Sequence, residues 1–593
     1  MTRTPLRPLA RILRAREEGD NPDAIERENL RRRHEAMRDK LRLRAEGRLL
    51  VLSLFFVSAF AMVGLRMGHL AASEPSEPRS ASAGHFIATQ RADILDRNGR
   101  ILATNLLTHS LYAQPPQMID KARAARELVA IFPDLDEQRL LRQFSGERKF
   151  IWIKRKISPE QMQQVHDIGD PGLMFGPREM RLYPNGRLAA HVLGGAGFGR
   201  EGVHSAEIVG VAGVEKTFDE FLRDPANAGA PLQLSIDLTI QSAARPVLWG
   251  GMKLMNAKAA SMVLMDAHTG EVISLVSLPD FDPNKRPAPP TSGQASDSPL
   301  FNHAVQGVYE LGSTFKSFTA AQALEDGLAQ VDTLIDTKGP LVWGRYKIRD
   351  SHRMPPKMSL ADMIVKSSNV GSARVAQEIG AERQKDFLRN LGLLEPSPIE
   401  LVEARSVRPL FPSNWSEISA MTISYGHGVS VSPLHLAAAY ATLLNGGRKV
   451  SPTILRTARA EPGPRVLSPE VSIAMRGILR DVVRHGTATM GEVPGYNVAG
   501  KTGTADKPNP VGGYYEDRVI STFASAFPAE NPRYVLVVTL DEPEETSGLE
   551  PRRTAGWTAV PVAAEIIRRT APLLGLRPAI EPDLVNAVSL TSN

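Results

Sequence analysis

The stretch 261-SMVLMDAHTGEVISLVS-277 contains two runs rich in β-branched and apolar residues, joined by a short turn that includes Gly270. This pattern is typical of two adjacent β-strands. The segment that follows has mostly helical patterns, notably at 311–325 and 360–380. Three more strand-like runs occur far downstream, at 497–505, 519–527 and 534–540. We therefore predict one five-stranded antiparallel sheet, built from both ends of this domain and flanked by helices.

The chain upstream of residue 231 has a different texture. The stretch 91-RADILDRNGRILATN-105 has strand-like halves around Asn98-Gly99, which is a strong hairpin signal. Residues 120–145 alternate helical patterns with short turns. Because 593 residues are too many for one core, these patterns indicate a multidomain α+β protein.

Composition excludes several classes of function. Residues 1–48 contain 14 Lys and Arg against 9 Asp and Glu, so they carry +5 of the net charge of +6. The rest of the chain is nearly neutral, which argues against nucleic acid as the main partner. The chain has no cysteine, which excludes disulfides, thiolate catalysis and cysteine–zinc sites.

One segment has the length and character of a membrane span. The stretch 49-LLVLSLFFVSAFAMVGL-65 has no charged residue, and with the residues after it approaches the ~20 that a bilayer requires. We predict a transmembrane helix at 49–70, a cytoplasmic basic arm at 1–48 and an exported remainder, following the positive-inside rule. A Ser/Pro/Glu-rich linker at 71–84 comes next. The alternative is a cleaved signal peptide, which the long charged lead disfavours.

Three short motifs each occur once and in a fixed order. They are the SxxK pair Ser313 and Lys316, the SxN pair Ser367 and Asn369, and the run 501-KTGT-504. Alone, each has a structural explanation, because Ser313 could cap a helix, the SxN pair could end one, and KTG could end a strand. Their joint occurrence on a helix start, a helix end and a strand favours a catalytic constellation instead, of the kind found in β-lactamases and penicillin-binding proteins.

The residue types suit acyl transfer. Ser313 needs a neighbouring base to act as a nucleophile, and Lys316 can be that base if its amine is neutral. Burial and the positive charge of Lys501 favour the neutral amine. Ser367 can relay a proton to the leaving amine, and Asn369 can bond Lys316 and the substrate amide.

The KTGT run is the candidate substrate-binding element. Lys501 supplies positive charge for a carboxylate, and Thr502 and Thr504 can donate hydroxyl hydrogen bonds to it, with Gly503 between them. The backbone N–H groups of Ser313 and Thr504 are predicted to form an oxyanion hole. No metal and no cofactor are expected, and His427 and His435 are interpreted as surface or packing residues.

With these motifs the chain resembles a known family, the class B penicillin-binding proteins. Within that family it resembles the division-specific FtsI-type peptidoglycan D,D-transpeptidases. Beyond the three motifs, the resemblance covers RADILDRNGRILA at 91–103, with Ala92 where the family usually has Gly, and in-order matches at 181–194, 213–222, 232–241, 263–284, 424–447 and 485–505. The division subtype is indicated by 309-YELGSTFK-316 and 346-YKIRDSH-352.

The resemblance implies an elongated α+β pedestal at 85–230, a β-lactamase-like transpeptidase domain at 231–570 and a flexible tail at 571–593. It implies that Ser313 attacks the penultimate D-Ala of a stem peptide, releases terminal D-Ala and passes the acyl group to a neighbouring stem, and that β-lactams acylate it. It also implies a place in the bacterial inner membrane at the division site. A membrane glycosyltransferase of the SEDS type and other division proteins are the implied partners.

Four alternatives remain open from the sequence. An elongation-type class B transpeptidase would share the SxxK, SxN and KTG motifs. A β-lactamase shares SxxK and KTG, but no deacylating base is evident. A β-lactam sensor would need a signalling segment that the short arm does not resemble. A division scaffold would act through its span and pedestal, with catalysis secondary.

Overall fold

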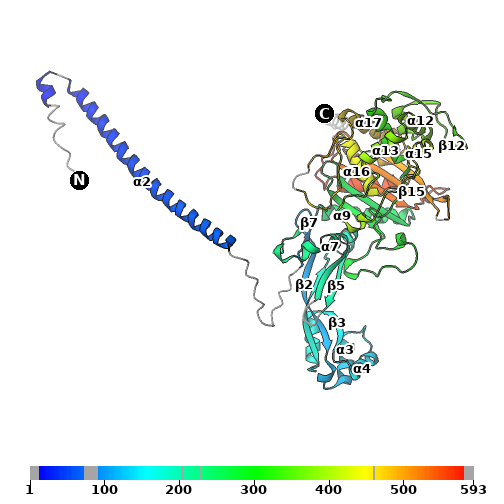
Figure 1. Cartoon of the computed structure of the whole chain (residues 1–593), viewed down its shortest axis with the longest axis horizontal. Coiled ribbons are helices and arrows are strands. Elements are labelled where there is room, and N and C mark those ends of the chain that lie inside the picture. Colours follow the sequence, from blue (N-terminus) through cyan, green and yellow to red (C-terminus); the bar gives the residue numbers. More distant parts are fainter. Residues whose placement is uncertain are drawn as a thin grey trace, which may run out of the picture. The chain divides into compact units, whose positions relative to one another are not determined.

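The computed structural model of the chain (Figure 1) describes residues 13–19, 21–72, 91–201, 206–227, 229–457, 461–509 and 511–579. The predicted linker at 71–84 lies outside these residues from position 73, and the predicted tail at 571–593 from position 580. The chain forms two compact units, residues 1–87 and 88–593.

The first unit is dominated by a single helix, α2 (Pro22–Ala72). Its segment Leu49–Met67 is long and apolar enough to cross a membrane, and none of it is buried within the protein. These 19 residues are about 28 Å long, close to the ~30 Å thickness of a bilayer's hydrocarbon core. The basic arm and the apolar segment are therefore parts of one continuous helix.

The predicted sheet is present in the second unit. Its strands follow the order β14–β15–β16–β8–β9 and all neighbours are antiparallel. The strands are β8 (Ala259–Asp266), β9 (Val272–Leu278), β14 (Ala499–Pro508), β15 (Tyr514–Phe527) and β16 (Tyr534–Asp541). The two ends of the domain meet at β16, where Val538 pairs with Met262 on one side and Phe523 on the other.

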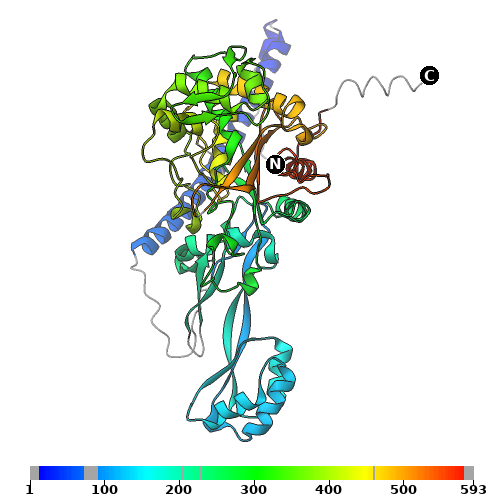
Figure 2. The same cartoon turned by 90° about the vertical axis from the view of Figure 1, so that its right-hand side faces the viewer.

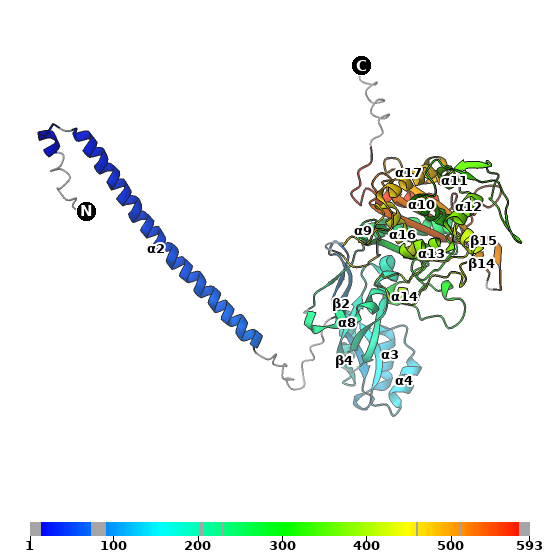
Figure 3. The ribbon, with the colours of Figure 1, turned by 45° about the horizontal axis from the view of Figure 1, so that its top comes forward.

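Helices cover both faces of this sheet (Figure 3). Helices α9 (Leu238–Leu254) and α18 (Ala559–Thr570) pack together against it, and α16 (Pro433–Leu444) packs on β8, β15 and β16. Every residue of β16 is buried as a result. A strand covered on both faces becomes a continuous apolar run, which is why 534-YVLVVTL-540 lacks polar alternation.

The helical segments next to the sheet differ in one respect from the prediction. A short 3₁₀ turn, η6 (Gly312–Phe315), leads into α10 (Lys316–Glu325), as expected for 311–325. The run 360–380, however, is two helices, α11 (Leu360–Val365) and α12 (Asn369–Ile379). The break occurs because the Ser368 hydroxyl accepts a hydrogen bond from the backbone N–H of Gly371 and so starts a new helix.

The region before the five-stranded sheet contains the predicted hairpin. Strands β1 (Ile94–Leu95) and β2 (Ile101–Ala113) are antiparallel, and Gly99 in their turn has a φ of 82°. Strand β2 also pairs with β3 (Ile151–Ile157) and β4 (Leu173–Leu182), which run toward a group of helices (Figure 2). These include α3 (Lys121–Ile131) and α4 (Glu137–Ser145), which lie in the run predicted to be helical.

Three apolar clusters are present among the described residues. One is formed by residues between Leu111 and Leu173, one joins Ala92, Ile94 and Leu102 of the hairpin region to the five-stranded sheet, and a small one includes Val370 of α12. The hairpin is therefore packed with the sheet domain although it lies before residue 231. The domain boundaries drawn from the sequence stay a prediction.

A buried ionic cluster ties this junction together. The Glu215 carboxylate is fully buried and lies 2.7 Å from Nε of Arg91 and 2.7 Å from Nε of Arg181. Arg91 also lies 2.7 Å from Asp219 Oδ1. Removal of one partner from such a cluster leaves a buried charge without compensation, which costs far more than loss of an exposed pair.

We expect Glu215→Ala to lower the free energy of unfolding by about 3–5 kcal/mol, because two buried guanidinium groups lose a carboxylate. Denaturant unfolding of the full chain, followed by circular dichroism, measures this. The control is Glu127→Ala, which removes an exposed pair with Arg123 and should change stability little. Equal losses in the two variants would contradict a structural role for the cluster.

Candidate active site

The three sequence motifs converge on one pocket of about 600 Å³. Ser313, Ser367, Asn369, Thr502 and Thr504 all line it. Lys316 and Lys501 lie beneath its surface and are completely buried. Motifs separated by 54 and 134 residues in sequence are thus brought together, as predicted, by the packing of η6, α10 and α12 beside strand β14.

Ser313 lies in η6 and is half-buried. Neither η6 nor α10 has a side-chain cap, and their N-cap residues are Leu311 and Phe315, so Ser313 is not the N-cap of the helix that it precedes. The backbone beside it touches strand β14, since a Cβ added to Gly312 would lie 2.6 Å from the Thr504 carbonyl oxygen and 3.1 Å from its nitrogen. The backbones of Ser313 and Thr504 are therefore neighbours, as an oxyanion hole made from both requires.

Two buried amines meet at one hydroxyl group. Lys316 Nζ donates hydrogen bonds to the Ser367 carbonyl oxygen, at 2.5 Å, and to Ser367 Oγ, at 3.0 Å. Lys501 Nζ also donates to Ser367 Oγ, at 3.0 Å. A hydroxyl oxygen has two lone pairs and one proton, so Ser367 can accept from both amines and still donate to a third group.

Burial shifts the protonation of both amines. It lowers the pKa of Lys316 well below its usual range, and the charge of Lys501 lowers that pKa further, against a smaller opposing effect of Asp350. Burial lowers the pKa of Lys501 to about 7. The neutral Lys316 that a base requires is thus favoured for the two reasons predicted from the sequence.

Two expected contacts are not formed. Among the described residues, no hydrogen bond joins Ser313 to Lys316 or Asn369 to Lys316. The Lys316 amine is directed to Ser367, and Asn369 Nδ2 donates to the Arg349 carbonyl oxygen at 3.0 Å. Hydrogen bonds at catalytic centres are often long before substrate binds, so the Ser313 to Lys316 separation is compatible with a base role.

Asp350 holds the SxN segment in place. Its carboxylate accepts hydrogen bonds from the backbone N–H groups of Asn369, at 2.5 Å, and Val370, at 3.2 Å, and from Ser368 Oγ, at 3.0 Å. A carboxylate at the start of α12 also suits the positive end of the helix dipole. Asp350 lies within the quoted stretch 346-YKIRDSH-352, but its spacing from Asn369 carries no recognisable signal.

The KTGT run lies on β14 with alternating side chains. Thr502 Oγ1 lies 2.6 Å from Thr487 Oγ1, and Thr504 Oγ1 accepts a hydrogen bond from Ala555 N–H at 3.0 Å. Gly503 faces the other way, and a Cβ there would lie 2.1 Å from the Leu311 carbonyl oxygen. In this structure, Gly503 provides the space for close packing against the segment that carries Ser313.

His427, interpreted as a surface or packing residue rather than a metal ligand, is partly exposed in the wall of the catalytic pocket. His427 lines the catalytic pocket with Tyr425, and its Nδ1 lies 3.1 Å from Glu310 Oε2. The hydrogen bond to Glu310 raises the pKa of the imidazole, although burial opposes this. Glu310 also accepts from Tyr514 OH, at 3.0 Å. Residue type and spacing alone could not show that these side chains share one wall.

His435 is a packing residue, as interpreted. It is 5% exposed and bonds the Ser432 hydroxyl and the Glu395 carbonyl oxygen. Among the described residues, no group of three or more His, Asp or Glu side chains is placed to hold a metal ion.

We expect Gly503→Ala to slow acylation by a β-lactam about 10²-fold, because the new methyl group displaces β14 from Ser313 by a fraction of an ångström or more. Overpacking should also cost about 1–3 kcal/mol of stability. Stopped-flow acylation and thermal unfolding measure the two effects.

The matched control is Gly477→Ala in the interior of α17 (Pro469–His485), where a Cβ would meet nothing within 4 Å. It should raise stability by about 0.5–1 kcal/mol and leave acylation unchanged. A normal acylation rate in Gly503→Ala would show that the close approach is not required.

Known families match both parts of the second unit. Residues 260–568 match the penicillin binding protein transpeptidase domain, and residues 86–227 match the penicillin-binding protein dimerisation domain. These matches include the motifs on η6, α12 and β14 in the first case and the β1–β2 hairpin in the second.

Relatives span most of the chain. It is 35% identical to the "Probable peptidoglycan D,D-transpeptidase FtsI" of Caulobacter vibrioides, over 87% of each chain. It is 32% identical to the "Probable peptidoglycan D,D-transpeptidase PenA" of Neisseria meningitidis, over 82% of this chain and 85% of that protein.

A solved structure shares the fold. The crystal structure of penicillin binding protein 3 from Mycobacterium tuberculosis, complexed with aztreonam, has a TM-score of 0.63 and 26% identity, and the similarity covers 83% of this chain and 98% of that one. The chain therefore belongs to the class B penicillin-binding proteins of the FtsI type, a family of serine peptidoglycan D,D-transpeptidases.

Proposed function

We propose that this transpeptidase crosslinks stem peptides during division through a Ser313 acyl-enzyme. The observation that carries the assignment of residues is the convergence of two buried amines on the Ser367 hydroxyl, beside Ser313 in one pocket. A neutral amine, a relay hydroxyl and a charged amine are the groups that acyl transfer from a D-Ala-D-Ala terminus needs.

In the first step, Ser313 Oγ attacks the carbonyl carbon of the penultimate D-Ala, and the Lys316 amine accepts the hydroxyl proton. The carbonyl oxygen becomes an oxyanion held by the backbone N–H groups of Ser313 and Thr504. Lys501, Thr502 and Thr504 bind the terminal carboxylate. When the C–N bond breaks, the leaving D-Ala amine takes a proton that passes from Lys316 through Ser367.

In the second step, the amine of a neighbouring stem attacks the ester and loses its proton to the same Ser367–Lys316 pair. A new amide forms, and the Ser313 hydroxyl is restored. A β-lactam follows only the first step, because its leaving amine stays attached to the acyl group and blocks the acceptor. Asp350 supports both steps by holding residues 368–370, and Asn369 lies where it can bond the substrate amide.

The N-terminal unit supplies the proposed location. Residues 1–48 are cytoplasmic, the helix at 49–70 spans the inner membrane once, and the catalytic part faces the periplasm, because the basic arm precedes the apolar segment. The division site is supported by the names of the FtsI relatives. A SEDS-type glycosyltransferase and other division proteins are the proposed partners, since neither matched domain is assigned to glycan polymerisation.

We expect benzylpenicillin to form one stable covalent adduct on Ser313 of the full chain in detergent, and none on Ser313→Ala. Intact and peptide mass spectrometry over time measures this. The control is Ser242→Ala on the exposed part of α9, which should react normally. Rapid loss of the adduct would indicate a β-lactamase, and no adduct on the wild type would favour a scaffold.

We expect acylation by penicillin to have a bell-shaped pH dependence. Lys316 must be neutral, so the rate rises as pH rises through its lowered pKa; Lys501 must be charged, so the rate falls above about pH 7. Because the two amines share Ser367, the limbs report pKa values of the pair. Lys501→Arg keeps its charge and should remove the alkaline limb alone. An unchanged alkaline limb in that variant would overturn the role of Lys501.

A further inference from the structure

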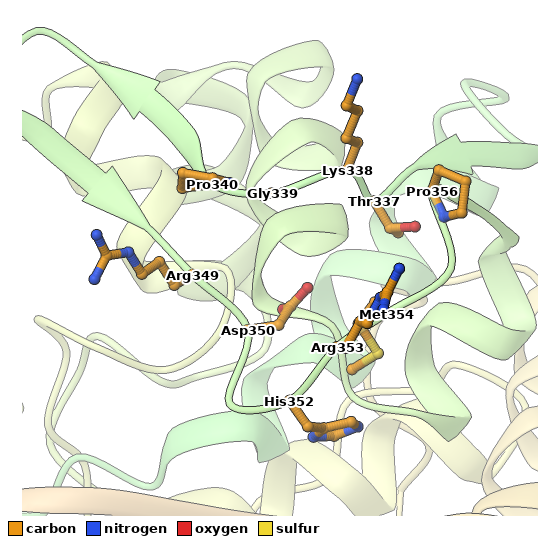
Figure 4. A pocket seen from close by; sticks show the side chains of 10 residues that line it. All are labelled: Thr337, Lys338, Gly339, Pro340, Arg349, Asp350, His352, Arg353, Met354 and Pro356. Atoms are coloured by element: carbon orange, nitrogen blue, oxygen red, sulfur yellow. The ribbon is translucent and has the colours of Figure 1, made fainter.

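A second cavity, of about 640 Å³, adjoins the catalytic pocket. It lies between the segment 337–340, which connects β10 (Leu334–Asp336) to β11 (Leu341–Trp343), and the loop 349–356, which connects β12 (Tyr346–Ile348) to β13 (Lys357–Ser359). In Figure 4, Asp350 lies between Arg349 on one side and Arg353 on the other, Lys338 lies on the opposite segment, and the Arg349 and Lys338 side chains extend away from Asp350.

The charge of this cavity is positive. Its lining includes three cationic side chains, Lys338, Arg349 and Arg353, all exposed, and one carboxylate, Asp350. In the part of the chain that the structure describes, none of the three cations forms an ion pair. The nearby Asp336 carboxylate is paired with Arg374 at 3.2 Å.

Asp350 offsets only one of these three positive charges, so the four side chains carry a net charge of +2. Its two oxygens are occupied by hydrogen bonds from Ser368, Asn369 and Val370 at the start of α12. The carboxylate is therefore directed to the helix, and the cations are left without an acidic partner of their own. Three exposed cations around one hollow attract an oxyanion, and an arginine guanidinium can bind a carboxylate through two parallel hydrogen bonds.

The cavity adjoins the site of acyl transfer and shares a lining residue with it. His352 lines both pockets, and Ser351 lines the catalytic one. The Asn369 side chain, which lines the catalytic pocket, bonds the backbone carbonyl oxygen of Arg349. A peptide bound beside Asn369 can extend past His352 into the cationic cavity.

We propose that this cavity is a subsite for the free carboxylates of the stem peptide that reacts at Ser313. The proposal rests on the proposed function and adds a specificity to it. The KTGT run binds the terminal D-Ala carboxylate, and Lys338 and Arg353 bind acidic side groups farther along the same peptide. A peptide with amides in place of those groups lacks the charge and gains nothing from the subsite.

The test compares KM for two synthetic stem peptides, one with free side carboxylates and one with those groups amidated, using the full chain in detergent. The variant is Lys338→Gln with Arg353→Gln. Arg349 is left intact so that the backbone segment whose carbonyl oxygen accepts from Asn369 is not disturbed. Two exposed ion pairs are worth up to about 2 kcal/mol, so the preference of the wild type for the carboxylate peptide should fall about three- to thirtyfold.

The control is Arg345→Gln, which removes an exposed cation that lies over the Tyr346 ring and outside the cavity lining. The preference of the Arg345→Gln variant for the carboxylate peptide should equal that of the wild type. Added salt should reduce the preference of the wild type more than that of the double variant, because exposed charges are screened.

An unchanged preference in the double variant would overturn the subsite, and so would equal KM values for the two peptides in the wild type. Penicillin acylation of Ser313, measured in parallel, separates these results from failure of the proposed function. If the wild type is acylated and crosslinks while the preference is absent, only the subsite is wrong. If the wild type is not acylated, the proposed function itself fails.

Discussion

Two lysine amines, both removed from water and both within 3.0 Å of the Ser367 hydroxyl oxygen, cannot easily carry charge together. The amines are at most about 6 Å apart, so two positive charges would repel by roughly 3 kcal/mol at an effective dielectric constant of 20, or about two pKa units. Burial adds to this cost. One proton is therefore lost near neutral pH, and the pair holds one base and one cation.

The asymmetry within this pair decides its chemistry. Lys501 lowers the pKa of Lys316, whereas the pKa of Lys501 is lowered by burial alone. The two causes agree with each other if Lys316 loses its proton first, because the neutral Lys316 amine no longer repels the positive charge of Lys501. The base is then at the start of α10, directly after the turn that carries Ser313, and the cation is on the strand that receives a carboxylate. One hydroxyl connects the two and can carry protons between them.

The contact of Lys316 and Lys501 with Ser367 requires backbone segments of the surrounding fold to lie very close together. Gly312, Gly426 and Gly503 each lie where a Cβ would come within 2.6 Å of a backbone oxygen of a neighbouring segment. Strand β14 can therefore lie against the segment that carries Ser313, and the wall that carries Tyr425 and His427 can close the pocket. Asp350 then holds the third segment by capping α12. The same loop contributes Arg349, Arg353 and His352 to the lining of the second, cationic cavity. One short segment therefore both holds the SxN residues in place and lines the proposed carboxylate subsite.

Much of this protein was determined by the sequence itself. Five apolar strand runs, one charge-free span and three ordered motifs with unambiguous residue types were sufficient to predict the sheet, the apolar segment of α2 and the convergence of the motif residues on one pocket. Local pattern has this power where a feature depends on side-chain type and periodicity. The break between α11 and α12, the direction of the Lys316 amine toward Ser367, and the places of Asp350 and His427 were decided only by tertiary structure. Each of these features depends on contacts between segments that are distant in the chain. The free energy of such a contact depends on the distance and orientation of the two partners, and a local sequence pattern specifies neither.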